Sequence, residues 1–216
     1  MHYVSGEFLP RHVHEEAFAT VVLTGGYVEA GDTGRHRAGP GDVVLHWPYE
    51  NHLNRVELRR TEIIVIPLDF RRIPYACGRI ADPDSLMRIV ESDPASAQLA
   101  LLEQLKYRVE APADWPDDLA RALQDDPSLR LGDWAREHGL SVGSVSRGFA
   151  QVYGISASSY RLLQRAQRAI RDILATDEPL STIAQHCRFA DQAHMCRTVQ
   201  RVTALSPGRL RTRPRA

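Results

Sequence analysis

Long hydrophobic runs, paired cysteines and a net charge are all missing from this sequence of 216 residues. Apolar runs such as Ile63–Ile66 are far shorter than the ~20 residues that cross a bilayer, which argues against a membrane protein. The amino terminus lacks the basic-then-apolar pattern of a secretory signal, so we expect the chain to stay in the cytoplasm. Cys77, Cys187 and Cys196 have no CxxC spacing, which predicts reduced thiols rather than a disulfide framework or a zinc site.

The zero net charge hides an uneven distribution of charge. From Ser128 onward there are 14 arginines, no lysine and six acidic residues, a net charge of +8, so the preceding segment carries −8. Guanidinium groups bind phosphate through paired donors, so the basic segment favours a polyanionic partner. A solvated surface with scattered arginines is the alternative that charge alone leaves open.

Composition is that of a globular protein, and the length allows one or two domains. Short apolar segments separated by Gly and Pro turns predict strands in the first 70 residues, at Phe18–Leu23, Tyr27–Ala30, Val43–Leu45 and Glu57–Pro67. Apolar spacings of three and four then predict helices over 84–92 and 95–109, and residues 111–116 are the best linker candidate. We therefore expect an α+β protein with a β domain at 1–80, a helical linker segment at 81–112 and an all-α domain at 113–216.

The helical linker segment carries a leucine stripe, Leu99, Leu102 and Leu105. A small β domain offers it no obvious partner, so we expect these leucines to pair two subunits in a homodimer. The alternative is that they pack back on their own domain.

The segment Leu131–Tyr153 has the pattern of a helix-turn-helix unit. Trp134 and Ala135 are apolar, Gly139 allows a bend, and Ser141 can cap a second helix. Val145, Phe149 and Val152 would form the inward face of that helix, which in a helix-turn-helix enters the major groove of DNA.

The same pattern recurs about fifty residues later. Ile183–Ala184 repeats Trp134–Ala135, Asp191 stands in the place of Ser141, and Arg197 repeats Arg147. Met195, Val199 and Val202 repeat the inward row, and one long helix over 157–175 would join the two units. A single match would more often be an ordinary helical hairpin, but two in register within a basic segment predict DNA binding.

Residues 119–211 resemble the DNA-binding domain of AraC/XylS-type transcription regulators, which has two helix-turn-helix units joined by a long helix. The specific pieces are Leu140-Ser141, Ser146-Arg147, Gly154-Ile155-Ser156, Phe189-Ala190-Asp191 and Leu205-Ser206-Pro207. Arg188 replaces the usual turn glycine, and a non-glycine residue at positive φ costs on the order of 1 kcal/mol. Met195 and Val199 replace aromatic residues and Cys196 a small hydroxyl residue, which favours the first unit as the better reader of sequence.

Helix geometry and this resemblance together select candidate DNA contacts. They are Ser144, Ser146, Arg147, Gln151, Gln192, Cys196, Arg197 and Arg201. Arginine can bond guanine and glutamine can bond adenine, each with about 1–3 kcal/mol of discrimination. Arg147 and Arg197 have a competing role as phosphate clamps or internal salt-bridge partners. Phosphate anchoring is expected of Arg201, Arg165, Arg168 and the tail 209–215.

The first 80 residues resemble a small cupin barrel. His12-Val13-His14 is similar to the first cupin motif, and Gly41–His52 is similar to the second. The resemblance implies that His12, His14 and His52 line a ligand pocket, or hold a divalent metal together with a glutamate. The position expected for that glutamate holds Phe18 or Ala19, so a small-molecule effector or a structural role is favoured over a metal.

Together these features predict an effector-responsive, sequence-specific DNA-binding transcription regulator, an activator or a repressor, that is not an enzyme and has no membrane partner. Promoter DNA, a second copy of the chain and a small effector are the expected partners. A metal-dependent cupin enzyme with a helical carboxy-terminal module is the alternative. A third interpretation is a DNA-binding protein whose cupin serves only in assembly.

Overall fold

The computed structural model describes residues 2–69, 77–108, 114–126 and 128–212, and it divides into two compact units, Met1–Pro112 and Ala113–Ala216. Residues 111–113 of the expected linker and 213–215 of the arginine tail lie outside the described residues. No described helix is both long and apolar enough to cross a bilayer.

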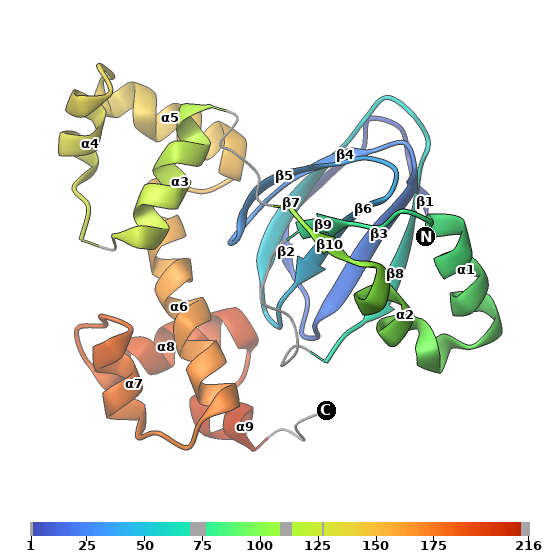
Figure 1. Ribbon diagram of the computed structural model, residues 1–216. Coiled ribbons are helices and arrows are strands. Elements are labelled where there is room, and N and C mark those ends of the chain that lie inside the picture. Colours follow the sequence, from blue (N-terminus) through green and yellow to red (C-terminus); the bar gives the residue numbers. More distant parts are fainter. Residues whose placement is uncertain (1, 70–76, 109–113, 127, 213–216) are drawn as a thin grey trace. The chain divides into compact units, whose positions relative to one another are not determined.

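The first unit consists of two antiparallel sheets (Figure 1). The larger has the order β1 (His2–Tyr3), β8 (Thr61–Pro67), β3 (Phe18–Thr24), β6 (Asp42–His46), β9 (Cys77–Arg79) and β10 (Lys106–Tyr107). The smaller has the order β2 (Phe8–Val13), β7 (Asn51–Val56), β4 (Tyr27–Gly31) and β5 (Gly34–Ala38). The β-rich character of this unit is therefore confirmed.

The strands predicted from hydrophobic runs are present, and the structure adds polar strands that the pattern does not predict. β3, β4 and β6 cover the expected segments. The strand predicted at Glu57–Pro67 is shorter in the structure, where β8 begins only at Thr61 and residues 57–60 connect it to β7. β2, β5 and β7 contain sequences such as RHV, GRHRA and NHLNRV, whose histidines, arginines and asparagines hide the strand pattern. His36, His52 and Asn54 of these strands are buried, and His52 and Asn54 take part in the site described below.

Two helices pack against the larger sheet of the first unit. They are α1 (Pro83–Ser92) and α2 (Ala97–Gln104), separated by a 3-10 turn (Pro94–Ser96). Leu86, Leu101 and Leu105 are buried in one core with Val21 and Ile64 of the sheet.

The leucine stripe packs in large part on its own domain, which is the alternative to a subunit interface. Leu105 is buried in the core and Leu102 packs against it, so only Leu99, 60% exposed, points outward. Helix α2 ends at Gln104 rather than continuing to 109, because Lys106–Tyr107 pairs with β9. This pairing holds the segment against its own sheet.

The second unit is helical throughout its described part. Its elements are α3 (Trp115–Asp125), α4 (Leu131–Glu137), α5 (Val142–Tyr153), α6 (Ala157–Ala175), α7 (Leu180–His186), α8 (Gln192–Thr203) and α9 (Pro207–Arg211). The expected connecting helix over 157–175 coincides with α6. Figure 1 shows α4 and α5 near one end of α6, and α7 and α8 near the other.

Candidate nucleic-acid interface and histidine cluster

The first turn of the second unit has the geometry of a helix-turn-helix. Gly139 lies at φ +65°, and the Leu140 amide donates to the carbonyl of Ala135 at 2.8 Å. The Ser141 hydroxyl accepts from the amide of Ser144 at 3.0 Å and so caps α5, as its sequence position predicts.

The second turn has the same backbone conformation and the same pattern of hydrogen bonds. Arg188 lies at φ +58° in the place of Gly139, and the Phe189 amide donates to the carbonyl of Ala184 at 2.9 Å. The Asp191 carboxylate caps α8 through the amide of His194 at 2.6 Å. The non-glycine residue predicted at positive φ is therefore confirmed, with its strain of about 1 kcal/mol.

The inward faces of α5 and α8 also correspond. Val145 and Phe149 of α5, and Met195 and Val199 of α8, are completely buried. The buried row then continues through Tyr153 and Thr203, whereas the expected Val152 and Val202 are only half-buried. The repeat reaches into the following helices, where Tyr160 and Leu210, also fifty residues apart, are both fully buried.

The outward faces carry the candidate DNA contacts. All eight are exposed except Cys196, which is half-buried: Ser144, Ser146, Arg147, Gln151, Gln192, Cys196, Arg197 and Arg201. Within the described part of the chain, Arg147, Arg197 and Arg201 form no salt bridge, so their guanidinium groups are available to an external anion. Ser144 is less available, because its hydroxyl shares a 2.9 Å hydrogen bond with that of Ser141.

Other arginines of this unit serve its internal structure. Arg168 donates to the carbonyl of Gln124, and Arg161 donates to the carbonyl of Leu129 at 2.5 Å, so both tie α6 to the preceding segment. Arg165 is half-buried, and burial lowers its pKa. The expected phosphate-anchoring role of Arg165 and Arg168 is therefore not supported by their surroundings, while Arg201 and Arg209 remain exposed.

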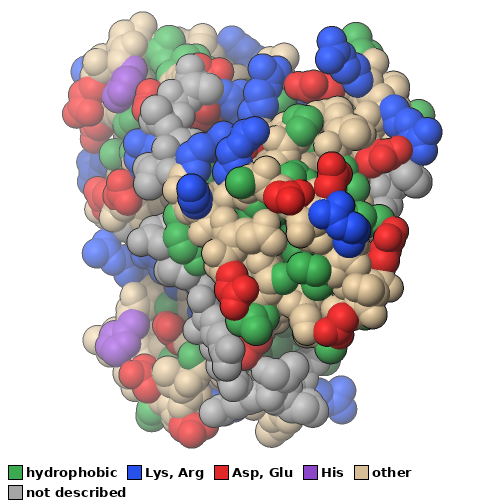
Figure 2. Space-filling model, turned by 45° about the vertical axis from the view of Figure 1, so that its right-hand side comes forward, with side chains coloured by type: hydrophobic (Ala, Val, Ile, Leu, Met, Phe, Trp, Pro, Cys, Tyr) green, Lys and Arg blue, Asp and Glu red, His purple; other side chains and the backbone are tan. Residues whose placement is uncertain are grey.

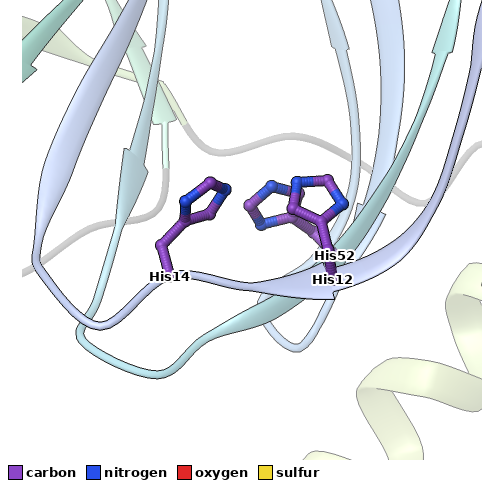
Figure 3. A group of neighbouring side chains, drawn as sticks. All are labelled: His12, His14 and His52. Carbon is purple, nitrogen blue, oxygen red and sulfur yellow. The ribbon is translucent and has the colours of Figure 1, made fainter.

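The first unit brings its three candidate histidines together (Figure 3). His12 of β2 is the register partner of His52 of β7, and His14 follows the end of β2. The ring centroid of His12 lies 4.4 Å from that of His52 and 4.9 Å from that of His14. One nitrogen of each of the three residues lies within 4.8 Å of the others, so this group has the donors for a metal ion or a polar ligand.

The expected glutamate position holds no carboxylate. Ala19 is buried in the core of the larger sheet, and the Phe18 ring stacks on His46 at 4.3 Å. A carboxylate instead comes from another strand: Glu29 of β4 forms a second group with His46 and His52, again with ligand atoms within 4.8 Å. Sequence reasoning missed Glu29 and His46, because their approach depends on how the two sheets face each other.

Burial controls the protonation of this second group. Loss of solvation raises the pKa of Glu29 to about 8 and lowers that of His46 to about 3. Burial also lowers the pKa of His52, to which the neighbouring histidines contribute. The imidazoles are thus neutral at pH 7, as histidine metal ligands must be. The Glu29 carboxyl, by contrast, stays protonated until a bound cation displaces the proton.

A shallow, open pocket of about 340 Å³ lies beside the exposed end of this cluster. His14 and Phe18 line it together with acidic and apolar neighbours: Glu15, Glu16, Ala17, Val65 and Pro67. It gives solvent access to His14.

Residues 134–213 match a protein-family model described as a helix-turn-helix domain. A comparison with curated protein sequences finds no match. Among solved structures, the chain is similar to a transcriptional regulator with an AraC-type DNA-binding domain from Chromobacterium violaceum, with 25% identity over 45% of this chain and 88% of that one and a TM-score of 0.42.

Two further structures are similar. One is fatty-acid-bound ToxT from Vibrio cholerae, with 10% identity over 97% of this chain and 92% of that one and a TM-score of 0.45. The other is the DNA-binding domain of AdpA in complex with a target DNA, with 21% identity over 46% of this chain and 91% of that one and a TM-score of 0.41.

Proposed function

We propose that this chain, whose residues 134–213 match a helix-turn-helix domain, is a DNA-binding transcription regulator of the AraC type that reads sequence through α5 and α8. One observation carries the proposal. Two helices fifty residues apart have the same caps, the same turns and the same buried rows, and both present arginines without a salt-bridge partner in the described chain on their outer faces.

The length of α6 supports the proposal that the two helices bind one face of a duplex. Helix α6 has 19 residues, which corresponds to roughly 28 Å of length. Half-sites one turn of B-DNA apart are separated by about 34–36 Å. Helices placed near the two ends of α6 are therefore suited to neighbouring segments of the major groove.

The direct test is binding of the full chain to a promoter fragment and to a scrambled duplex of the same composition, measured by fluorescence anisotropy. We expect at least about tenfold tighter binding to the specific fragment at physiological salt. Equal affinity for both would reduce the protein to a non-specific binder, and no binding to either would remove the proposal.

Regulation is proposed to come from the first unit. His12, His14 and His52 would bind a small polar effector through the adjacent pocket, and the effector would favour DNA-competent states by binding them more tightly. The test is a thermal-shift screen of the full chain followed by DNA titrations with each stabilising compound. A complete absence of stabilising compounds would favour a first unit that serves only in assembly.

A homodimer in the cytoplasm is also proposed, because a second copy would double the DNA contacts. The leucine stripe no longer supports it, and on the face in Figure 2 the described hydrophobic side chains are scattered among charged ones. The test is the mass of the protein in solution with and without DNA. A monomer in both conditions would contradict this part.

The alternative, a metal-dependent enzyme, draws on the histidine cluster alone. We propose a sensory rather than a catalytic role for this unit. The alternative requires a metal in protein purified without chelator and turnover that chelation abolishes.

A further inference from the structure

Three polar side chains lie close together inside the first unit, and one polar atom of each has no hydrogen-bond partner among the described residues. Glu29 and His52 come from the smaller sheet and His46 from the larger, and all three are at most 4% exposed. Within the described residues, Glu29 Oε1, His46 Nδ1 and His52 Nδ1 have no hydrogen-bond partner. Each unpaired buried polar atom lowers the stability of the fold by on the order of 1–3 kcal/mol, so a ligand that pairs with these three atoms would stabilise the folded protein.

The three side chains are already held in place around a common point. The Phe18 ring stacks on His46 at 4.3 Å, and the His46 and His52 ring centroids are 4.6 Å apart. Asn54 donates to Glu29 Oε2 at 2.9 Å, which orients the carboxylate and leaves Oε1 free to face His46 Nδ1 at 3.6 Å. This is the arrangement of a ligand oriented by an outer hydrogen bond.

We propose that Glu29, His46 and His52 form a binding site for a divalent transition metal ion of the zinc class. Two imidazoles and one carboxylate with a fourth position left open are a donor set that Zn²⁺ takes. Ligand atoms at ~2.0–2.2 Å from a tetrahedral ion lie roughly 3.5 Å apart. Glu29 Oε1 and His46 Nδ1, at 3.6 Å, already meet this distance, and the limit of 4.8 Å within the group requires a closure of at most about 1.3 Å.

His14 and His12, which we call the rim histidines, provide the route by which the ion reaches this interior site. His14 is exposed, His12 half-buried and His52 buried, and their rings are adjacent in that order. His52 belongs to both groups, so an ion held inside leaves the rim without its third donor. The site therefore takes one ion per chain and needs neither His12 nor His14 to hold it.

The site goes beyond the proposed DNA-binding function and does not depend on it. The test is titration of the chelator-treated full chain with Co²⁺, whose visible absorption reports tetrahedral coordination. Two variants disable the interior site: Glu29→Gln, which keeps the acceptor for Asn54, and His46→Phe, which keeps an aromatic ring against Phe18. His14→Ala is the matched control at the rim.

We expect one equivalent of Co²⁺ to bind to the wild type with tetrahedral bands and no thiolate charge transfer, and to raise its unfolding temperature. Glu29→Gln and His46→Phe should bind at least about a hundredfold more weakly while keeping the near-ultraviolet circular dichroism of a folded protein. His14→Ala should keep the wild-type affinity within about threefold.

The reverse result, with His14→Ala losing the ion and Glu29→Gln retaining it, would place the ion at the rim and overturn the proposal. Absence of tetrahedral bands in the wild type would overturn it as well. DNA affinity of each variant, measured without metal, separates this outcome from a failure of the regulator function.

Discussion

Arg147 and Arg197 lie at equivalent points of α5 and α8, and neither forms a salt bridge within the described chain. The sequence predicted their equivalence and their exposure, because the fifty-residue repeat sets both. It could not predict that Arg165 and Arg168 are half-buried, since the carbonyl of Gln124 that binds Arg168 comes near only when α3 packs on α6.

Arg147→Ala should lower affinity for a specific duplex by about tenfold or more and affinity for a scrambled duplex much less, because a base contact carries about 1–3 kcal/mol of discrimination. Fluorescence anisotropy with both duplexes measures the difference. Arg136→Ala is the control, since Arg136 is exposed but paired with Asp133 at 3.0 Å. An equal loss on both duplexes would reassign Arg147 to the phosphate backbone.

Glu29 makes a second residue-level prediction, on pH. Its pKa, near 4.5 when exposed, is raised to about 8 in the folded protein, so its contribution to stability is full below pH 4.5 and is lost as the pH rises through 8. The unfolded-state imidazoles of His46 and His52 are still half protonated at pH 6.5, so their lowered pKa values offset a small part of the fall up to about pH 7.5 and leave the range above it to the carboxyls. The free energy of unfolding of metal-free protein should fall by about 2 kcal/mol between pH 6.5 and 8.

Denaturant titrations at several pH values test this dependence. Glu29→Gln should remove most of the fall, leaving the smaller part from Glu50, whose pKa burial raises to about 7. Glu103→Gln, on the exposed side of α2, should leave the wild-type curve unchanged. A Glu29→Gln curve as steep as that of the wild type would contradict this interpretation.

Four helices of the second unit begin at a residue whose side chain caps them. Ser141, Ser156, Asp191 and Ser206 each accept an amide hydrogen bond from the first turn of their helix, so the boundaries of α5, α6, α8 and α9 follow from local chemistry. The strands of the first unit are less local. β2 and β7 pair with strands distant in sequence, whereas β5 forms a hairpin with the neighbouring β4, and the polar residues of all three strands give no strand pattern.

Gly139 supports a prediction about the turn between α4 and α5. It lies at φ +65° with no atom within 4 Å of the place that an added Cβ would take, so Gly139→Ala would suffer backbone strain alone, about 1–2 kcal/mol of lost stability. Gly132 lies within α4, also in open space, and Gly132→Ala should gain up to about 1 kcal/mol from helix propensity. Urea unfolding of both variants gives the comparison, and the same sign of change for both would contradict it.

The molecule has a helical unit with a net positive charge and a β-rich unit with a net negative charge. The charges along the sequence reveal these two parts, although the change of sign at Ser128 lies inside the helical unit, after the acidic helix α3. The polar interior of the first unit cannot be found in that way, because alternation along a strand marks only which residues share a face. Glu29 lies in the smaller sheet and His46 in the larger one, so their approach depends on how the two sheets pack together.

Because the second unit carries a net positive charge, we expect its DNA affinity to fall steeply as the salt concentration rises. With Arg201 and Arg209 each neutralising a phosphate, these two residues should contribute roughly −2 to the slope of log affinity against log salt concentration. Titrations at several salt concentrations measure it, and Arg201→Ala should flatten the slope by about one. A slope near zero is incompatible with phosphate binding by this unit.

Selection of bound fragments from random duplexes, using the full chain, tests the central claim most directly. Two recognition helices at opposite ends of α6 should enrich a sequence of two short elements centred about 10–10.5 base pairs apart. Arg147→Ala should erase the preference at one element and Arg197→Ala at the other. Enrichment of no sequence, or of one that both variants select unchanged, would contradict the account.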